Sequence, residues 1–156
     1  GGIYRHSNNF FVNKWVVRQR YKNTTPIQIR KGSSGAREML NLLRKNGAIA
    51  MLVDQKLSSG VRVNFFGSDA MTSDGAASLA IKYNYPVIPM NVERTKGSNF
   101  KVSFHPEIKI NKTSDKQNDI MAFTTEINKF LEQCITKNPE GWFWIHNRWD
   151  KKFNLN

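Results

Sequence analysis

The chain has 156 residues, of which 39% are apolar, and its 24 Lys and Arg residues outnumber 12 acidic ones to give a net charge of +12. This length and apolar content predict a single domain over residues 1–156 with a real hydrophobic core, and they exclude collagen, a disulfide scaffold and a disordered tail. The single Cys134 cannot form an intramolecular disulfide, and the longest apolar run, residues 48–53, is far shorter than the roughly 20 residues that cross a bilayer.

The positive charge is concentrated in the first third of the chain. Residues 1–53 hold ten Lys and Arg residues and one acidic residue, Glu38, a net charge of +9, whereas residues 54–156 carry +3. A basic surface of this kind attracts nucleic acid, anionic lipid headgroups or a phosphorylated ligand, and charge alone does not choose among them. Part of the excess also fits a merely solubilising surface.

The first predicted helix begins at Ser34 as its N-cap and is stopped by Gly47. Its apolar residues follow the i, i+3, i+4, i+7 spacing of one buried face, and they are Ala36, Met39, Leu40 and Leu43. The apolar run at residues 48–53 follows directly and favours a strand buried on both faces. A helix followed by a buried strand indicates an α/β sheet.

The middle of the chain predicts a strand, a helix and a hairpin. The strand spans residues 61–66 and is ended by Gly67, and the helix begins with capping residues at Thr72 and closes at residues 85–86. A strand at residues 87–92 contains Pro89, which favours an edge, an end or a bulge. It pairs with residues 100–104 through a turn at residues 96–99.

The last part of the chain predicts one long helix and an aromatic segment. The helix starts at Asp115 or Asp119, runs to Lys137 at helical spacing of apolar residues, and ends at residues 138–139. Residues 142–149 form the densest aromatic segment of the chain. The predicted fold class is α/β, with a mixed central sheet flanked by helices.

Several common site signatures are absent from the sequence. It contains no Gly-x-Gly-x-x-Gly, no P-loop and no Cys pair for zinc, and residues 32–36 only approach the nucleophile-elbow pattern, so we expect neither a cofactor nor a metal.

His6 and His105 are predicted at the surface. His146 is either functional or, as we favour, a structural histidine held by a hydrogen bond.

Other polar positions allow two interpretations each. Asp54 follows the predicted buried strand, where α/β sheets form their ligand crevice, but it could equally cap the next turn. The helix start at residues 72–75 could bind an anion, although ordinary N-capping is favoured. Arg30 and Lys31 could hold a phosphate or be solvated, and the same alternatives apply to Arg5 and to Asn9.

Several short motifs follow one another along nearly the whole chain. They are Tyr4-Arg5 with Asn9; Arg30-Lys31 with Gly35-Ala36-Arg37; Val53-Asp54-Gln55; Val63-x-Phe65-Phe66-Gly67 with Ala70 and Thr72; Gly75-Ala76 and Leu79-Ala80; Pro86-Val87-Ile88-Pro89 with Arg94; Pro139-Glu140; and Trp142-x-Trp144-x-His146-x-Arg148-Trp149. In this order they resemble the bacterial lipid A biosynthesis acyltransferases, the lauroyl/myristoyl acyltransferase type within the lysophospholipid acyltransferase superfamily. The block from Asp54 to Thr72 and the Trp-x-His-x-Arg-Trp ending are the most discriminating.

The resemblance implies transfer of a fatty acyl chain from acyl carrier protein to a hydroxyl of a lipid A precursor in lipopolysaccharide biosynthesis. It also implies a location at the cytoplasmic face of the bacterial inner membrane and a fold like that of the glycerolipid acyltransferases, incomplete at the N-terminus. The expected partners are the acyl carrier protein, the phosphorylated lipid A precursor and an anionic membrane surface, with no nucleic acid. A cationic first third suits all three of these partners.

In such enzymes a His-x-x-x-x-Asp/Glu pair supplies the general base that deprotonates the acceptor hydroxyl, and the carboxylate orients the imidazole. The pair is missing here, because the fifth residues after His6, His105 and His146 are Phe11, Ile110 and Lys151. In the family the pair precedes the Tyr-Arg element. We therefore expect no catalytic residue in this chain, a general base upstream of it, and no acyl transfer by these residues alone.

The resemblance further implies which residues contact the substrates. Arg30 matches the arginine of the superfamily's second motif, which helps to hold the phosphorylated acceptor, and Asp54-Gln55 stands where relatives have Glu-Gly. The expected substrate-binding residues are Arg5, Asn9, Arg30, Lys31, Arg37, Asp54, Gln55, Thr72, Arg94, His146 and Arg148.

Two alternatives remain open from the sequence. The first is a basic module for RNA or single-stranded DNA that uses residues 142–149 as a stacking platform, although no nucleic-acid motif supports it. The second is a catalytically inactive member of the same family. An upstream segment with the His-x-x-x-x-Asp/Glu pair would favour the enzyme over both.

Overall fold

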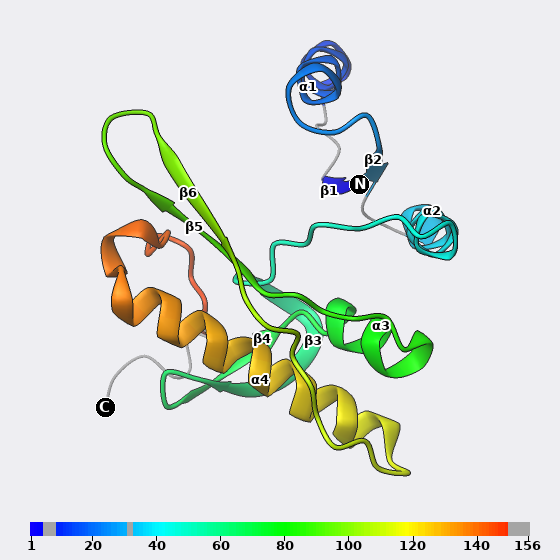
Figure 1. Cartoon of the computed structure of the whole chain (residues 1–156), viewed down its shortest axis with the longest axis vertical. Helices are drawn as coiled ribbons and strands as arrows, with labels where there is room; N and C mark the ends of the chain where they lie inside the picture. The colour runs from blue at the N-terminus through cyan, green and yellow to red at the C-terminus, as the bar shows by residue number, and fades with distance from the viewer. Residues whose placement is uncertain (5–8, 31–32, 150–156) are drawn as a thin grey trace. The chain divides into compact units, whose positions relative to one another are not determined.

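The computed structural model describes residues 1–4, 9–30 and 33–149, with the backbone only for Tyr4, Arg30 and Ser33 (Figure 1). The chain divides into two compact units, Gly1–Leu52 and Val53–Asn156, and each is described by itself. Four helices and three two-stranded sheets make up the described elements, so the predicted α/β class is confirmed. The described strands form these three separate sheets in place of the one central sheet that we predicted.

The first unit opens with short elements that the sequence pattern did not reveal. Strand β1 (Gly2–Tyr4) pairs in parallel with β2 (Gln28–Arg30), and helix α1 (Phe10–Asn23) connects them. Asn9 is the N-cap of α1, and its side-chain oxygen accepts the amide hydrogen of Val12 at 3.1 Å. Strands of three residues are too short for a periodic pattern, and α1 contains no buried residue, so neither gives a clear apolar face.

Helix α2 (Ser33–Arg44) confirms the first predicted helix, but Ser34 lies inside it, so the prediction of Ser34 as its N-cap was wrong. Asn46 adopts the left-handed backbone region with a φ of 57°. The amide of Gly47 donates to the carbonyl of Leu42 at 3.0 Å, which closes the end of the helix. The helix thus ends just before Gly47, as predicted, and the residue in the left-handed conformation is Asn46.

The strand predicted at residues 48–53 is not formed. Its one described pairing is an isolated parallel bridge between Ala50 and Gly2, and the side chain of Leu52 is 84% exposed. A fully buried strand needs a neighbour on each edge and a layer on each face. The prediction of a buried strand was wrong, because an apolar run alone does not provide those neighbours.

The second unit is built on an antiparallel hairpin of β3 (Lys56–Phe65) and β4 (Ser68–Thr72). Phe66 and Gly67 form its turn with φ values of 51° and 77°. The pairing is irregular near the open end, where Thr72 lies opposite both Lys56 and Val61. Gly60 lies within this bulge, and a Cβ atom there would overlap the carbonyl of Thr72, so the close approach requires glycine.

Helix α3 (Gly75–Tyr83) follows β4 and begins after Asp74. The predicted helix start at Thr72 was wrong, because Thr72 is the last paired residue of β4 and is fully buried. Asn84, with a φ of 58°, ends α3 in the left-handed region. Ala76, Ala77 and Ala80 are buried, and their small side chains allow α3 to pack closely against α4.

The predicted hairpin and the predicted long helix are both confirmed. Strand β5 (Met90–Arg94) pairs antiparallel with β6 (Phe100–Phe104) and starts directly after Pro89, which lacks an amide hydrogen for a ladder. Helix α4 (Lys116–Lys137) begins at the N-cap Asp115, whose carboxylate accepts the amide hydrogens of Gln117 and Asn118. A 3₁₀ turn (Pro139–Gly141) then leads into the aromatic segment.

Helix α4 packs against β3 and α3, and the core of the second unit lies between these elements (Figure 1). Phe65, Ala70 and Ile135 are buried at its centre, and three partly buried side chains pack on them: Leu131, Trp142 and Trp149. The aromatic segment thus contributes two of its tryptophans to this core. None of the helices in the described ranges is long and apolar enough to cross a membrane.

Candidate functional site

Arg148 lies at the centre of a buried polar cluster in the second unit. Its side chain is fully buried, and one terminal nitrogen donates to the carbonyl of Met71 at 3.0 Å. The other terminal nitrogen donates to Oγ1 of Thr72 at 2.7 Å. The planar guanidinium thus binds a backbone and a side-chain oxygen at the end of β4 at the same time, which suits its fixed arrangement of donors.

Thr72 connects Arg148 to helix α4. Its hydroxyl donates to the carbonyl of Ala70 at 3.1 Å and accepts from Nδ2 of Asn128 at 3.4 Å. The same Nδ2 atom donates to the carbonyl of Asn64 at 2.8 Å, so Asn128 ties α4 to both strands of the hairpin. Thr72, Asn128 and Arg148 are all fully buried.

His146 secures the open end of the same hairpin. Its Nε2 atom accepts the amide hydrogen of Lys56 at 2.9 Å, and Lys56 lies opposite Thr72 in the strand pairing. An accepting Nε2 atom has no proton, so the neutral ring carries its hydrogen on Nδ1. The lone pair of Nε2 is occupied, which agrees with a structural histidine held by a hydrogen bond. We refer to Thr72, Asn128, His146 and Arg148 as the Arg148 cluster.

Aromatic rings cover the Arg148 cluster on the side of Phe65. The guanidinium carbon of Arg148 lies 4.7 Å from the centroid of the Phe65 ring, in the range of a cation–π contact. Trp142 and Trp149 pack on the same ring with centroid distances of 5.8 and 5.6 Å. The indole nitrogen of Trp149 donates to the carbonyl of Phe65 at 3.1 Å.

The charge of Arg148 is only partly compensated. Burial lowers the pKa of its guanidinium from the ordinary value, because desolvation disfavours the charged form, and the negative charge of Asp54 opposes this lowering. The Nε atom of Arg148 and Oδ1 of Asn128 are buried without a hydrogen-bond partner in the described part of the chain. The negative charge of Asp54, at the start of the second unit, therefore favours the charged form of this buried guanidinium.

The arrangement joins three distant parts of the sequence. Residues 146 and 148 bind the β3–β4 hairpin from the C-terminal segment, and Asn128 binds it from α4. The aromatic segment does this without forming a strand, and the side chains of His146 and Arg148 both reach the same hairpin. The Arg148 cluster thus locks the end of the hairpin.

The structure brings three of the predicted substrate-binding residues together, namely Thr72, His146 and Arg148, and the charge of Asp54 acts on the guanidinium of Arg148. Gln55 follows Asp54 and is exposed. Arg94 is exposed on its hairpin, where its guanidinium carbon lies 4.9 Å from the centroid of the Phe100 ring.

The remaining predicted residues belong to the first unit. Asn9 caps α1, Arg37 is exposed on α2, and the backbone of Arg30 pairs with that of Tyr4. Arg5 and Lys31 lie outside the described residues, as does His6. The contact of each of these residues with a substrate stays a prediction.

Asn128 is the cluster member that sequence reasoning missed. It lies seven residues before Ile135 and four after Thr124, and both of these residues are buried on α4. A polar amide at such a core position predicts a buried hydrogen bond, because an unpaired amide there would be costly. The heptad-like spacing of Asn128 was therefore a usable signal.

Two other side chains, those of His105 and Cys134, are half-buried. His105, predicted at the surface, is half-buried, since its Nε2 atom lies 2.7 Å from Oδ1 of Asn91 and its ring packs edge-on against Phe130. Cys134 is half-buried on α4, and burial raises the pKa of its thiol, with a smaller contribution from the charge of Glu93. A raised pKa disfavours the reactive thiolate, so Cys134 fits a structural role.

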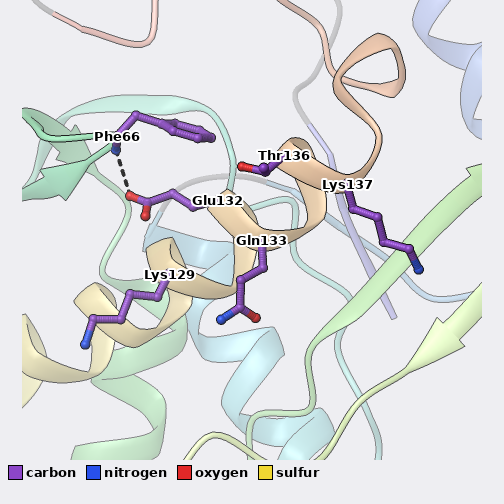
Figure 2. Close-up of a pocket in the computed structure, with 6 residues that line it drawn as sticks. All are labelled: Phe66, Lys129, Glu132, Gln133, Thr136 and Lys137. Atoms are coloured by element: carbon purple, nitrogen blue, oxygen red, sulfur yellow. Dashed lines mark hydrogen bonds between the residues drawn. The ribbon is translucent and has the colours of Figure 1, made fainter.

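A shallow hollow between α4 and the β3–β4 turn contains none of the predicted site residues (Figure 2). Glu132 closes one side by accepting the amide hydrogen of Phe66 at 2.7 Å. The side chains of Lys129 and Lys137 extend away from Phe66 in Figure 2. The carboxylate of Glu132 thus binds the backbone of the β3–β4 turn. No group of three metal-binding side chains occurs among the residues described.

A family model for bacterial lipid A biosynthesis acyltransferases matches residues 1–151 of the chain. The chain belongs to this family. A comparison with curated proteins finds no match. Membership confirms the resemblance drawn from the motifs, and the family is one of acyltransferases that act in lipid A biosynthesis. In this member, the two most discriminating motifs meet in the Arg148 cluster, because Thr72 belongs to one and Arg148 to the other.

Proposed function

We propose that this acyltransferase family member takes part in transferring a fatty acyl chain from acyl carrier protein to a hydroxyl of a phosphorylated lipid A precursor. The observation that carries the proposal is the family match over residues 1–151. The reaction breaks the thioester of the carrier protein, forms an ester with the acceptor hydroxyl, and returns the hydroxyl proton to the released thiol. Its proposed location is the cytoplasmic face of the bacterial inner membrane, at an anionic lipid surface.

The general base of this reaction is proposed to lie upstream of these residues. None of the three histidines has an acidic residue five positions later, and the Nε2 atom of His146 already accepts the amide hydrogen of Lys56. In this proposal, the described residues supply the acceptor side of the site and its scaffold. The 156-residue chain alone then gives no turnover.

The charges of the chain support a phosphorylated acceptor. Residues 1–53 carry a net charge of +9, and this part contains the predicted phosphate ligand Arg30. A guanidinium that binds a phosphate makes charge-assisted and often bidentate hydrogen bonds. Asp54, whose negative charge acts on the buried guanidinium of Arg148, is proposed to orient polar groups of the acceptor.

The Arg30→Ala substitution tests this assignment in a polypeptide that contains these residues together with the upstream pair. We expect the KM for the phosphorylated acceptor to rise about tenfold to hundredfold, because one charge-assisted interaction is worth roughly 1.5–3 kcal/mol. The KM for the acyl carrier protein donor should change little. Initial rates with each substrate varied in turn measure both constants.

The matched control is Lys96→Ala, which removes one exposed cation from the β5–β6 turn. It should leave both KM values near those of the unsubstituted enzyme. An equal rise in both constants for Arg30→Ala would show a structural role for Arg30. A dephosphorylated acceptor should be insensitive to the substitution.

A further inference from the structure

Helix α1 presents an unusual combination of exposed aromatic and basic side chains. Phe10, Phe11, Trp15 and Tyr21 are 68, 80, 63 and 62% exposed, and no residue of α1 is buried. Proteins seldom leave several large aromatic side chains together in water, so a cluster of this kind marks an interaction surface.

Three of the four basic side chains of α1 share one face. Lys14, Arg18 and Lys22 are spaced four residues apart, which places them in one row along the helix, and all three are exposed. At 100° per residue, Phe11 and Trp15 form a parallel row directly beside them. The helix contains no acidic residue, and Glu38 is the one acidic residue in residues 1–53.

We propose that α1 is an interfacial helix that binds anionic lipid headgroups and seats its aromatic rings at the boundary between headgroups and acyl chains. Tryptophan and other aromatic rings favour this boundary, and each nearby Lys or Arg adds attraction to an anionic leaflet. Fourteen residues at 1.5 Å each give a helix of about 21 Å, which lies along a membrane and does not span it.

The composition of the exposed face favours lipid over the other polyanions. Val12 is 48% exposed beside Phe11, and its aliphatic side chain gains from an acyl environment but cannot stack on a nucleic acid base. Phe10 and Phe11 pack edge to face with centroids 5.6 Å apart, so they form one compact apolar end on α1. This inference extends the proposed membrane partner and does not depend on the acyl transfer reaction.

Vesicle binding by the 156-residue chain tests the proposal. Vesicles with about 30% phosphatidylglycerol in phosphatidylcholine should bind the chain, and pure phosphatidylcholine vesicles should bind it much more weakly. The triple substitution Lys14→Gln, Arg18→Gln, Lys22→Gln should weaken binding to the anionic vesicles about a hundredfold, since three basic side chains lose their headgroup contacts. Rising salt should weaken binding of the unsubstituted chain by screening the same charges.

The matched control carries the same loss of charge in the second unit. Lys96→Gln, Lys101→Gln, Lys116→Gln removes three exposed cations and should weaken binding about threefold or less. Equal losses in the two triple variants would overturn the proposal, because binding would then report only net charge. Circular dichroism should show that both variants keep their helices, since all six side chains are exposed.

Trp15 provides a direct readout of insertion. Vesicles with brominated acyl chains should quench part of the tryptophan fluorescence, and Trp15→Phe should remove that part. Phe11→Ala with Trp15→Ala should weaken vesicle binding about tenfold. Unchanged vesicle binding by the α1 variants, with lost affinity for an acidic acyl carrier protein, would contradict the proposal and assign α1 to a protein partner.

Discussion

The Arg148→Met substitution is expected to lower the free energy of unfolding of the second unit by about 2–4 kcal/mol. The guanidinium donates to the carbonyl of Met71 and to Oγ1 of Thr72, and methionine leaves both buried oxygens without that donor. Each buried acceptor that loses its partner costs roughly 1–3 kcal/mol. Urea unfolding followed by tryptophan fluorescence measures the change, because Trp142 and Trp149 lie beside the cluster.

Arg37→Met is the matched control, since Arg37 is an exposed arginine on α2. It should change the free energy of unfolding by no more than about 0.5 kcal/mol. Arg148→Lys should give an intermediate loss, because a single ammonium cannot replace the fork that reaches two oxygens. Wild-type stability for Arg148→Met would contradict the role of the cluster as a lock on the hairpin.

Phe65→Ala is expected to cost about 3–5 kcal/mol, the usual range for removing a buried phenyl ring. Phe65 is fully buried, and its ring contacts both tryptophans of the core as well as the guanidinium of Arg148. The substitution should also change the near-ultraviolet circular dichroism of Trp142 and Trp149, since it opens a cavity between them.

Phe104→Ala is the control for Phe65→Ala, because Phe104 lies on strand β6 with 73% of its surface exposed. Its loss should remain within about 1 kcal/mol, since little apolar area is removed from contact. Similar losses for the two substitutions would show that Phe65 does not hold the core of the second unit.

The elements that sequence reasoning predicted well are those with two independent signals. Helix α4 combines an apolar stripe with the capping residue Asp115, and the β5–β6 hairpin combines alternation with a turn. The failures rest on one signal each. The apolar run at residues 48–53 predicts a buried strand, but burial on two faces depends on partners that the run itself does not contain.

Three of the four residues of the Arg148 cluster were predictable from the sequence, but their hydrogen bonds were not. Thr72, His146 and Arg148 were singled out by motif, yet their hydrogen bonds to one hairpin depend on a β3–β4 pairing that was only half foreseen. Threonine is a good N-cap, so Thr72 predicts a helix start, but its pairing within the β3–β4 hairpin overrides that preference. Asn128 was missed because no motif contained it.

The most direct measurement is acyl transfer from acyl carrier protein to a phosphorylated lipid A precursor, with the product detected by mass spectrometry. A polypeptide in which these 156 residues follow a His-x-x-x-x-Asp/Glu segment should add one acyl chain to the acceptor, and the 156-residue chain alone should add none. An unmodified acceptor with the longer polypeptide would contradict the proposed function. Turnover by the shorter chain would contradict the upstream location of its base.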